Sequence, residues 1–421
     1  MKNYSKKLIE NLNQYQFYDG KDVLMGDVLY YVIRDCEDVT LKNAIKAVIS
    51  SFLIMLFNSY EGNCRGSNID TCAIYTMSCG YRKDHVNAYN DVIDLIENRL
   101  KINISKRKLS LKNLKLFPYF FRWINDLKKV GIKFNQRLYL VNAMLQAQQS
   151  YNTVLDFLKS NNVNLKNFIV WCDVMPDDSY IVQKLNTKKV KTITLCHANF
   201  NIIDNSWAYK GAHSDVFVLH SEQAKNNAKK AGCRSNLLIA GDPHNISKLK
   251  RNYVEIEDIK TIGIILNGAA CDDINEKMIV FLQEYAKRNE KKIVVKLHPS
   301  NDYKKLKNIV DNTVTKIYGK EISISQFADL IDVVIVSNSN VFYEMLFLYK
   351  PLLVYAVEVD YHLCDDYPGI KFKDLDEFIY LIVNIPTNNY KKYYAECRNF
   401  YISSGDIKNN YVRCFKEIGI S

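Results

Sequence analysis

The sequence lacks several features that would narrow its class at once. It has no run of about 20 apolar residues, the length a helix needs to cross a bilayer, and its most hydrophobic stretch, residues 44–59, is shorter and begins with polar residues. The N-terminal MKNYSKKLIENLNQ has no apolar core of a signal peptide. We therefore expect a cytoplasmic protein, which could also bind peripherally to the inner face of the membrane. Residues 44–59 could form either a buried helix or a membrane-surface helix.

The sequence also lacks a cysteine motif. Eleven cysteines are scattered without any CxxC pair, and the spacing of Cys64, Cys72 and Cys79 matches no zinc pattern. An odd number of cysteines, several of them inside apolar runs, indicates reduced, buried thiols in an intracellular protein.

Positive charge is in excess, with 57 Lys and Arg against 46 Asp and Glu, a formal net charge of +11. Such a balance favours phosphates, anionic lipid or nucleic acid as partners. No RNA- or DNA-binding motif is present, and the basic residues are interspersed with acidic ones, so we expect no nucleic acid partner.

Strand-like and helix-like segments alternate along most of the chain, which indicates parallel βαβ units. At 421 residues, more than one domain is expected. We predict an α/β protein of two facing doubly wound Rossmann-like domains, residues 1–250 and 251–421, with extra helices at the N-terminus. Residues 1–70 and 101–158 are expected to be mainly helical, and the last helices could pack back on the first domain.

Three predicted strands of the second domain end in polar loops. Because ligands bind at the carboxyl ends of strands in open α/β sheets, these loops are candidates for one site. Ser and Asn at a helix start can cap it or bind phosphate, and Lys or His would add charge. The candidate residues for a phosphate-handling site are Gly268, Lys296, His298, Ser337, Asn338, Ser339, Asn340 and Glu344.

The segment KLHP at 296–299, followed by DVVIVSNSNVFYEMLFLYKPLLVY at 332–355, resembles the His-Pro and Ser-rich motifs of bacterial GT-B-fold glycosyltransferases. The most similar groups make capsule and lipopolysaccharide, or are bacterial sialyltransferases and CDP-glycerol glycerophosphotransferases. In the sialyltransferases these motifs bind the donor phosphate, which the resemblance assigns here to His298, Ser337 and Ser339. It implies the GT-B fold and transfer of a sugar from a nucleotide-activated donor to a glycan or lipid-linked acceptor in surface polysaccharide synthesis.

The resemblance leaves other functions open. A CDP-glycerol or CDP-ribitol polyol-phosphate transferase, a UDP-sugar epimerase, and a non-catalytic binding or scaffold protein can share the fold. No DxD motif follows a predicted strand, since Asp272-Asp273 and Asp365-Asp366 are adjacent pairs. We therefore expect no catalytic metal and no cofactor other than the nucleotide-activated substrate.

The first domain should supply the general base that accepts the proton of the acceptor hydroxyl. Asp173 and His197 each follow a predicted strand and are the two candidates. Arg82 and His85 could contact an acceptor or form a solvated turn. The basic stretch of residues 101–115 is either a solvated face or a site for anionic lipid, and the aromatic LFPYFFRW after it could enter a membrane interface or be buried.

Overall fold

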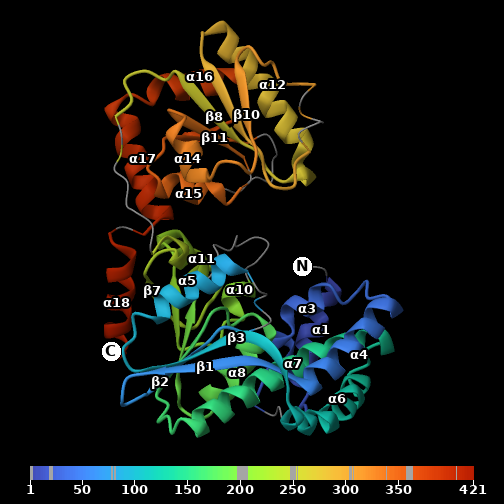
Figure 1. The fold of residues 1–421 in the computed structure, drawn as a ribbon. Coiled ribbons are helices and arrows are strands. Elements are labelled where there is room, and N and C mark those ends of the chain that lie inside the picture. The colour runs from blue at the N-terminus through green and yellow to red at the C-terminus, as the bar shows by residue number, and fades with distance from the viewer. Residues whose placement is uncertain are drawn as a thin grey trace. The chain divides into compact units, whose positions relative to one another are not determined.

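The computed structural model divides into two compact units, Met1–Ser247 with Ser403–Ser421, and Lys248–Ile402 (Figure 1). The structure describes residues 3–18, 22–76, 79, 82–196, 207–246, 253, 255–302, 306, 308–337, 339–356, 364–403 and 405–421. His197 and Asn338 therefore lie outside the described residues.

The first unit is built on a sheet of seven described strands in the order β1-β3-β2-β4-β5-β6-β7. All neighbours pair in parallel except β1 and β3, which pair antiparallel. The strands are β1 (Phe57–Arg65), β2 (Thr71–Ile74), β3 (Arg99–Leu109), β4 (Asn167–Val170), β5 (Lys191–Leu195), β6 (Val216–Leu219) and β7 (Asn236–Ile239).

Helices cover this sheet and extend beyond it. The N-terminal helices and α7 form one group beside it, and α18 lies along β7 (Figure 1). The helices are α1 (Asn3–Gln14), α2 (Met25–Val28), α3 (Tyr30–Arg34), α4 (Leu41–Leu56), α5 (Lys83–Ile93), α6 (Phe117–Lys129), α7 (Phe134–Ser160), α8 (Pro176–Asn186), α10 (Trp207–Lys210), α11 (Glu222–Lys230) and α18 (Ile407–Glu417), with 3-10 turns η2 (Leu111–Leu116) and η3 (Pro243–Asn245).

The expectation of helix over residues 57–65 and 101–109 was wrong, because these residues belong to the antiparallel pair β1 and β3. Leu100 and Ile102 are buried, whereas Lys101 between them extends to Asp94, with its Nζ 2.7 Å from the carboxylate. This alternation has the period of two that places successive side chains on opposite faces of a strand. The density of lysines in the segment hid the alternation.

The second unit holds a sheet of six described strands, all parallel, in the order β10-β9-β8-β11-β12-β13. Its central strand β11 reads VVIV and is fully buried, as expected for a β-branched strand covered on both faces. Its elements are β8 (Thr261–Ile265), η4 (Ala269–Cys271), α12 (Asp272–Arg288), β9 (Lys292–Lys296), β10 (Thr315–Tyr318), α14 (Ile324–Asp329), β11 (Val333–Val336), α15 (Val341–Phe347), β12 (Leu352–Tyr355), η5 (Pro368–Ile370), β13 (Lys371–Phe372), α16 (Leu375–Asn384) and α17 (Asn388–Tyr401).

Among the described helices, none combines the length and the apolar character needed to cross a membrane.

Candidate functional site

The strand order of the second sheet defines where a ligand would bind. The chain starts at β8, moves outward through β9 and β10, and then returns to the other side of β8 to form β11 and its neighbours. The order reverses between β8 and β11, and all carboxyl ends lie at one edge because the strands are parallel. In open α/β sheets this reversal opens a crevice outside the carboxyl ends of the strands, and ligands bind there.

Asn267, which follows β8, is the most informative residue at this edge. Its backbone is held by a reciprocal pair of hydrogen bonds: Asn267 N–H donates to Asn275 Oδ1 (2.9 Å), and Asn275 Nδ2 donates to the Asn267 carbonyl (3.0 Å). Its side chain is 3 % exposed, yet neither Nδ2 nor Oδ1 has a partner among the described residues. Buried polar atoms are rarely left unpaired, so this amide is an exception, and it lies at the edge where the strand order reverses.

His298, which follows β9, lies next to the β8 loop. Ser300 connects the two loops: Ala269 N–H donates to Ser300 Oγ (3.1 Å), and Ser300 Oγ lies 2.8 Å from His298 Nδ1. Because Ser300 N–H also donates to Nδ1 (3.2 Å), Nδ1 is an acceptor, and the network assigns the ring proton to Nε2. The exposed imidazole therefore offers an N–H donor, while its other nitrogen is fixed.

Gly268 completes this corner. A Cβ built on it would lie 3.4 Å from Ser300 Oγ and 3.6 Å from His298 Nδ1. The structure thus brings together Gly268 and His298 from the predicted set, and adds Asn267, Asn275 and Ser300. Asn267 and Ser300 adjoin predicted site residues in the sequence, so a close reading of the two loops could have included them.

Lys296 points elsewhere. It is buried, and its ammonium donates to the carbonyl of Gly319 at the end of β10. Burial lowers the pKa of Lys296, and the nearby carboxylate of Glu321 partly offsets that effect. We therefore correct the prediction that Lys296 meets a donor phosphate, because its charge is directed to the β10 loop.

The Ser- and Asn-rich loop after β11 also differs from the prediction. Ser337 is buried, and its hydroxyl donates to the carbonyl of Tyr355 (3.1 Å), so it ties β11 to β12 instead of facing a ligand. Ser339 Oγ accepts from Val341 N–H (3.4 Å) at the start of α15. Asn340 is the N-cap residue but makes no side-chain cap bond, and both Asn340 and Glu344 are exposed. Ser339, Asn340 and Glu344 remain proposed donor contacts.

In the first unit, Asp173 follows β4 but does not face a substrate. It is 1 % exposed, and its Oδ2 accepts from the backbone N–H groups of His213 and Ser214, at 2.8 Å each. Burial raises the pKa of Asp173, and the two donors and the nearby His213 counteract this. We therefore correct the prediction that Asp173 is the general base, because its carboxylate is enclosed and orders the loop before β6.

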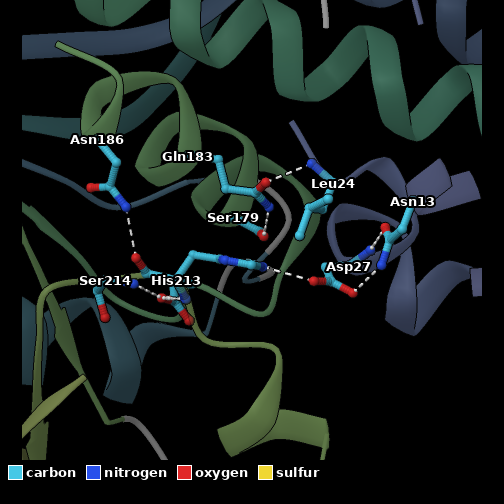
Figure 2. A network of polar contacts seen from close by, with 9 residues as sticks. Asn13, Leu24, Asp27, Ser179, Gln183, Asn186, His213 and Ser214 are labelled. Atoms are coloured by element: carbon cyan, nitrogen blue, oxygen red, sulfur yellow. Dashed lines mark hydrogen bonds and ion pairs between the residues drawn. The ribbon is translucent and has the colours of Figure 1, made fainter. Parts of the chain in front are cut away.

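The same loop is anchored to the N-terminal helices, as Figure 2 shows. His213 Nε2 lies 2.8 Å from Asp27 Oδ2, and Asn13 Nδ2 donates to Asp27 Oδ1 (2.8 Å). On the other side, Asn186 Nδ2 donates to the His213 carbonyl (2.7 Å). This network holds the N-terminal helices against the βα domain.

A second reversal of strand order lies between β2 and β4 in the first sheet, and Asp178 is buried there. Its carboxylate accepts from Thr76 Oγ1 (2.6 Å) and Cys172 N–H (2.7 Å). Burial raises the pKa of Asp178 to about 8. The residue therefore stays protonated at neutral pH. Its contacts with Thr76 and Cys172 connect the segments that follow β2 and β4.

Histidines also gather at the carboxyl edge of the first sheet. The ring centroids of His85 and His244 lie 5.0 Å apart, and both rings contact Trp171, which follows β4. Arg82, which the sequence grouped with His85, is exposed and pairs with Asp84 at 2.6 Å. No described residue other than Asp84, His85 and His244 forms a comparable group of potential metal ligands.

Comparisons with solved structures agree with this architecture. The UDP-GlcNAc 2-epimerase from Methanocaldococcus jannaschii superimposes with a TM-score of 0.51 at 13 % identity, covering 83 % of this chain and 100 % of that one. The lipopolysaccharide outer core galactosyltransferase WaaB gives 0.51 at 10 % identity, with the same coverage. Another UDP-N-acetylglucosamine 2-epimerase gives 0.50 at 11 % identity, covering 84 % and 97 %.

The chain has the GT-B fold. The sequence prediction of two Rossmann-like α/β domains is confirmed. At these identities the likeness concerns the fold alone. No protein-family model matches the sequence, and no curated protein matches it.

Asp178 makes the stability of the first unit depend on pH. Its carboxyl titrates near 3.8 in an unfolded chain and near 8 in the folded one, so the folded state holds the extra proton between these values. The contribution of Asp178 to the free energy of unfolding therefore decreases as the pH rises from about 3.8 to about 8, and it decreases no further above pH 8. In Asp178→Asn the side chain cannot ionise, so we expect the free energy of unfolding to fall less between pH 6 and pH 9 than in wild type.

Urea denaturation followed by tryptophan fluorescence measures this, since all three tryptophans (Trp123, Trp171 and Trp207) lie in the first unit. Thr76→Val is the control, because it removes a hydrogen bond but keeps the carboxyl group and hence the pH dependence. Equal pH dependence in wild type and Asp178→Asn would show that Asp178 ionises normally.

Proposed function

We propose that the chain is a glycosyltransferase of bacterial surface polysaccharide synthesis, which moves a sugar from a nucleotide-activated donor to a glycan or lipid-linked acceptor. The observation that carries the proposal is the unpaired, buried amide of Asn267 beside Gly268 and His298, at the reversal of strand order in the second unit. The fold supports the proposal, because a UDP-GlcNAc 2-epimerase and a lipopolysaccharide galactosyltransferase share it.

The chemistry requires that the departing nucleotide phosphate be stabilised. Preorganised donors that face developing negative charge supply such stabilisation. His298 Nε2–H is a donor whose ring orientation is fixed through Ser300, and Gly268 lets a phosphate approach the backbone closely. Ser339, Asn340, Glu344 and Asn338 are proposed to contact the rest of the donor. We propose that no metal ion is needed at this phosphate.

The acceptor hydroxyl requires a base, and we keep His197 for that role. In the sequence it follows the last residue of β5 by two positions. With Asp173 enclosed, His197 is the remaining residue of the predicted pair. This role rests on its position in the sequence and on the family resemblance.

A large exposed surface on the first unit favours a transferase with a lipid-borne acceptor over an epimerase, which needs no acceptor. Helix α4 buries Ala44, Ala47 and Met55 against its neighbours but is also apolar on its outer face. It packs against η2 and lies next to α6 (Figure 1), with the Phe52 and Phe117 rings 6.3 Å apart. The exposed apolar side chains are Leu41, Ile45, Ile49, Phe52, Leu53, Leu56, Leu109, Leu111, Leu114, Phe117 and Phe121.

Exposed basic residues are interspersed with these side chains along the same segments, and we call both sets together the apolar-basic surface. Its exposed cations are Lys42, Lys46, Lys108, Lys112, Lys115 and Arg122. Residues 41–60 and 98–125 contain no Asp or Glu. A symmetric contact with a second copy would bring the same lysines together, whereas an anionic bilayer complements both the charge and the apolar side chains. We therefore propose peripheral binding to anionic membrane.

Nucleotide binding tests the donor site. At 100 times its dissociation constant, the correct nucleotide should stabilise the second unit by about 2.7 kcal/mol, measured by calorimetry with CMP, CDP, UDP, GDP and ADP. Gly268 has φ −57°, which suits alanine, and the added methyl would make ordinary contacts with Ser300. Gly268→Ala should therefore fold normally but fill the space beside His298, weakening binding by about tenfold or more, or ~1.4 kcal/mol. His298→Ala should weaken binding similarly.

Thr313→Ala is the control, since Thr313 lies before β10 at the opposite edge of the same sheet. Binding should be equal in Mg²⁺ and in EDTA. Stabilisation by none of the nucleotides would contradict the proposal. Binding of CMP or CDP with turnover of CDP-glycerol would favour the polyol-phosphate transferase, and conversion of a UDP-sugar without acceptor would favour an epimerase.

Vesicle binding tests the apolar-basic surface. Each basic residue close to an anionic membrane contributes about 1 kcal/mol at low salt, so Lys112→Ser with Lys115→Ser should weaken binding to phosphatidylglycerol vesicles by about 30-fold. Lys229→Ser with Lys230→Ser, two exposed lysines of α11, should leave it unchanged. Co-sedimentation at rising salt measures this. Equal binding to phosphatidylcholine vesicles, or a dimer in solution that hides the surface, would contradict the assignment.

A further inference from the structure

Three side chains from two distant parts of the first unit converge at the carboxyl edge of its sheet. Asp84 and His85 lie in the first turn of α5, after β2, and His244 lies in η3, after β7. The potential ligand atoms of all three lie within 4.8 Å of one another. Helix α5 and η3 pack against each other, so the chain itself holds the group together.

His244 is oriented by a carboxylate behind it. Asp242 Oδ1 lies 2.8 Å from His244 Nδ1 and also accepts from the His244 backbone N–H (2.9 Å). The contact between the ring and the Asp242 carboxylate assigns the ring proton of His244 to Nδ1.

This arrangement leaves the lone pair of His244 Nε2 available. The Nε2 atom is buried and has no partner among the described residues. Histidines that bind metals commonly donate their other N–H to a carboxylate, which fixes the ring and strengthens the ligand. The pair Asp242 and His244 has that form.

His85 supplies a second imidazole, which is 9 % exposed. Its Nε2 lies 4.0 Å from Asp84 Oδ2, and the Trp171 ring packs against both imidazoles, which limits their movement.

We infer that Asp84, His85 and His244 form a binding site for one divalent cation of the zinc class. Two imidazoles and a carboxylate suit Zn²⁺ and its neighbours better than Ca²⁺ or Mg²⁺, which prefer oxygen ligands. Bonds of about 2.0–2.1 Å would bring the ligand atoms to about 3.4 Å apart. In the structure these atoms lie within 4.8 Å of one another, and the exposed Asp84 side chain can turn inward to shorten the distances. Three protein ligands leave one coordination position open.

Arg82 competes with the cation. Its guanidinium now pairs with the Asp84 carboxylate, and both side chains are more than half exposed, so the pair can separate at little cost. A bound cation would connect the segment after β2 with the segment after β7. This site lies in the first unit and is independent of the proposed donor site, where no metal is expected.

Cobalt spectroscopy on the full chain tests the inference without an activity measurement. Metal-free protein titrated with Co²⁺ should bind one equivalent and show the visible bands of a tetrahedral site, with no thiolate-to-cobalt charge-transfer band, and Zn²⁺ should displace the cobalt. His244→Ala and His85→Ala should abolish the signal, and His298→Ala should keep it. Asp242→Asn should weaken binding by about 10- to 100-fold.

Arg82→Ala should bind Co²⁺ more tightly, because the substitution removes a cation that competes for Asp84. Loss of stability alone would not tighten binding, so this variant separates the two explanations. None of the eleven cysteines forms a disulfide, and Cys64 is exposed, so a thiolate charge-transfer band would assign the metal to cysteine and overturn the site. Absence of binding, or an unchanged signal in His244→Ala, would also overturn it.

Discussion

Parallel pairing of every strand in the second sheet is the constraint on which the proposed function depends. Because β8, β9 and β11 run in the same direction, the loops that follow them emerge at one edge, although they are far apart in the sequence. The return of the chain from β10 to β11 then leaves Asn267 at the point where the order reverses. Asn275 fixes the backbone of Asn267, whereas the side-chain amide of Asn267 has no partner among the described residues.

The carboxyl edge of the first sheet is built differently. Asp173 and Asp178 are enclosed there, the first by two backbone amides and the second by Thr76 and Cys172. Both carboxyl groups are buried and already accept hydrogen bonds, so neither is placed to reach an exposed hydroxyl. Other described titratable groups at this edge include His85 and His244, whose rings contact Trp171.

The sequence predicted the architecture well because alternation of apolar strands with amphipathic helices is a local property. It placed Gly268 and His298 correctly at strand ends, and the structure joins them through Ser300. It failed where the partner of a side chain is distant in sequence: Lys296 donates to Gly319, Ser337 donates to Tyr355, and Asp173 accepts from His213. Residue type at a strand end cannot show which of these partners a side chain will find.

The same limit explains the group formed by Asp84, His85 and His244. His244 is about 160 positions from Asp84 and His85 in the chain, and their spacing matches no metal-binding motif. Only the packing of α5 against η3 brings them together. In contrast, the strand β3 was recoverable from the alternation of Leu100, Lys101 and Ile102, which the surrounding lysines obscured.

Hydrogen–deuterium exchange with and without a bound nucleotide tests the central claim most directly, because it locates the ligand on the backbone. The account predicts slower exchange of the amides in residues 266–269 and 297–301, the loops that follow β8 and β9. Protection that spares both loops and falls on other parts of the chain would contradict the assignment of the donor site to this edge of the second sheet.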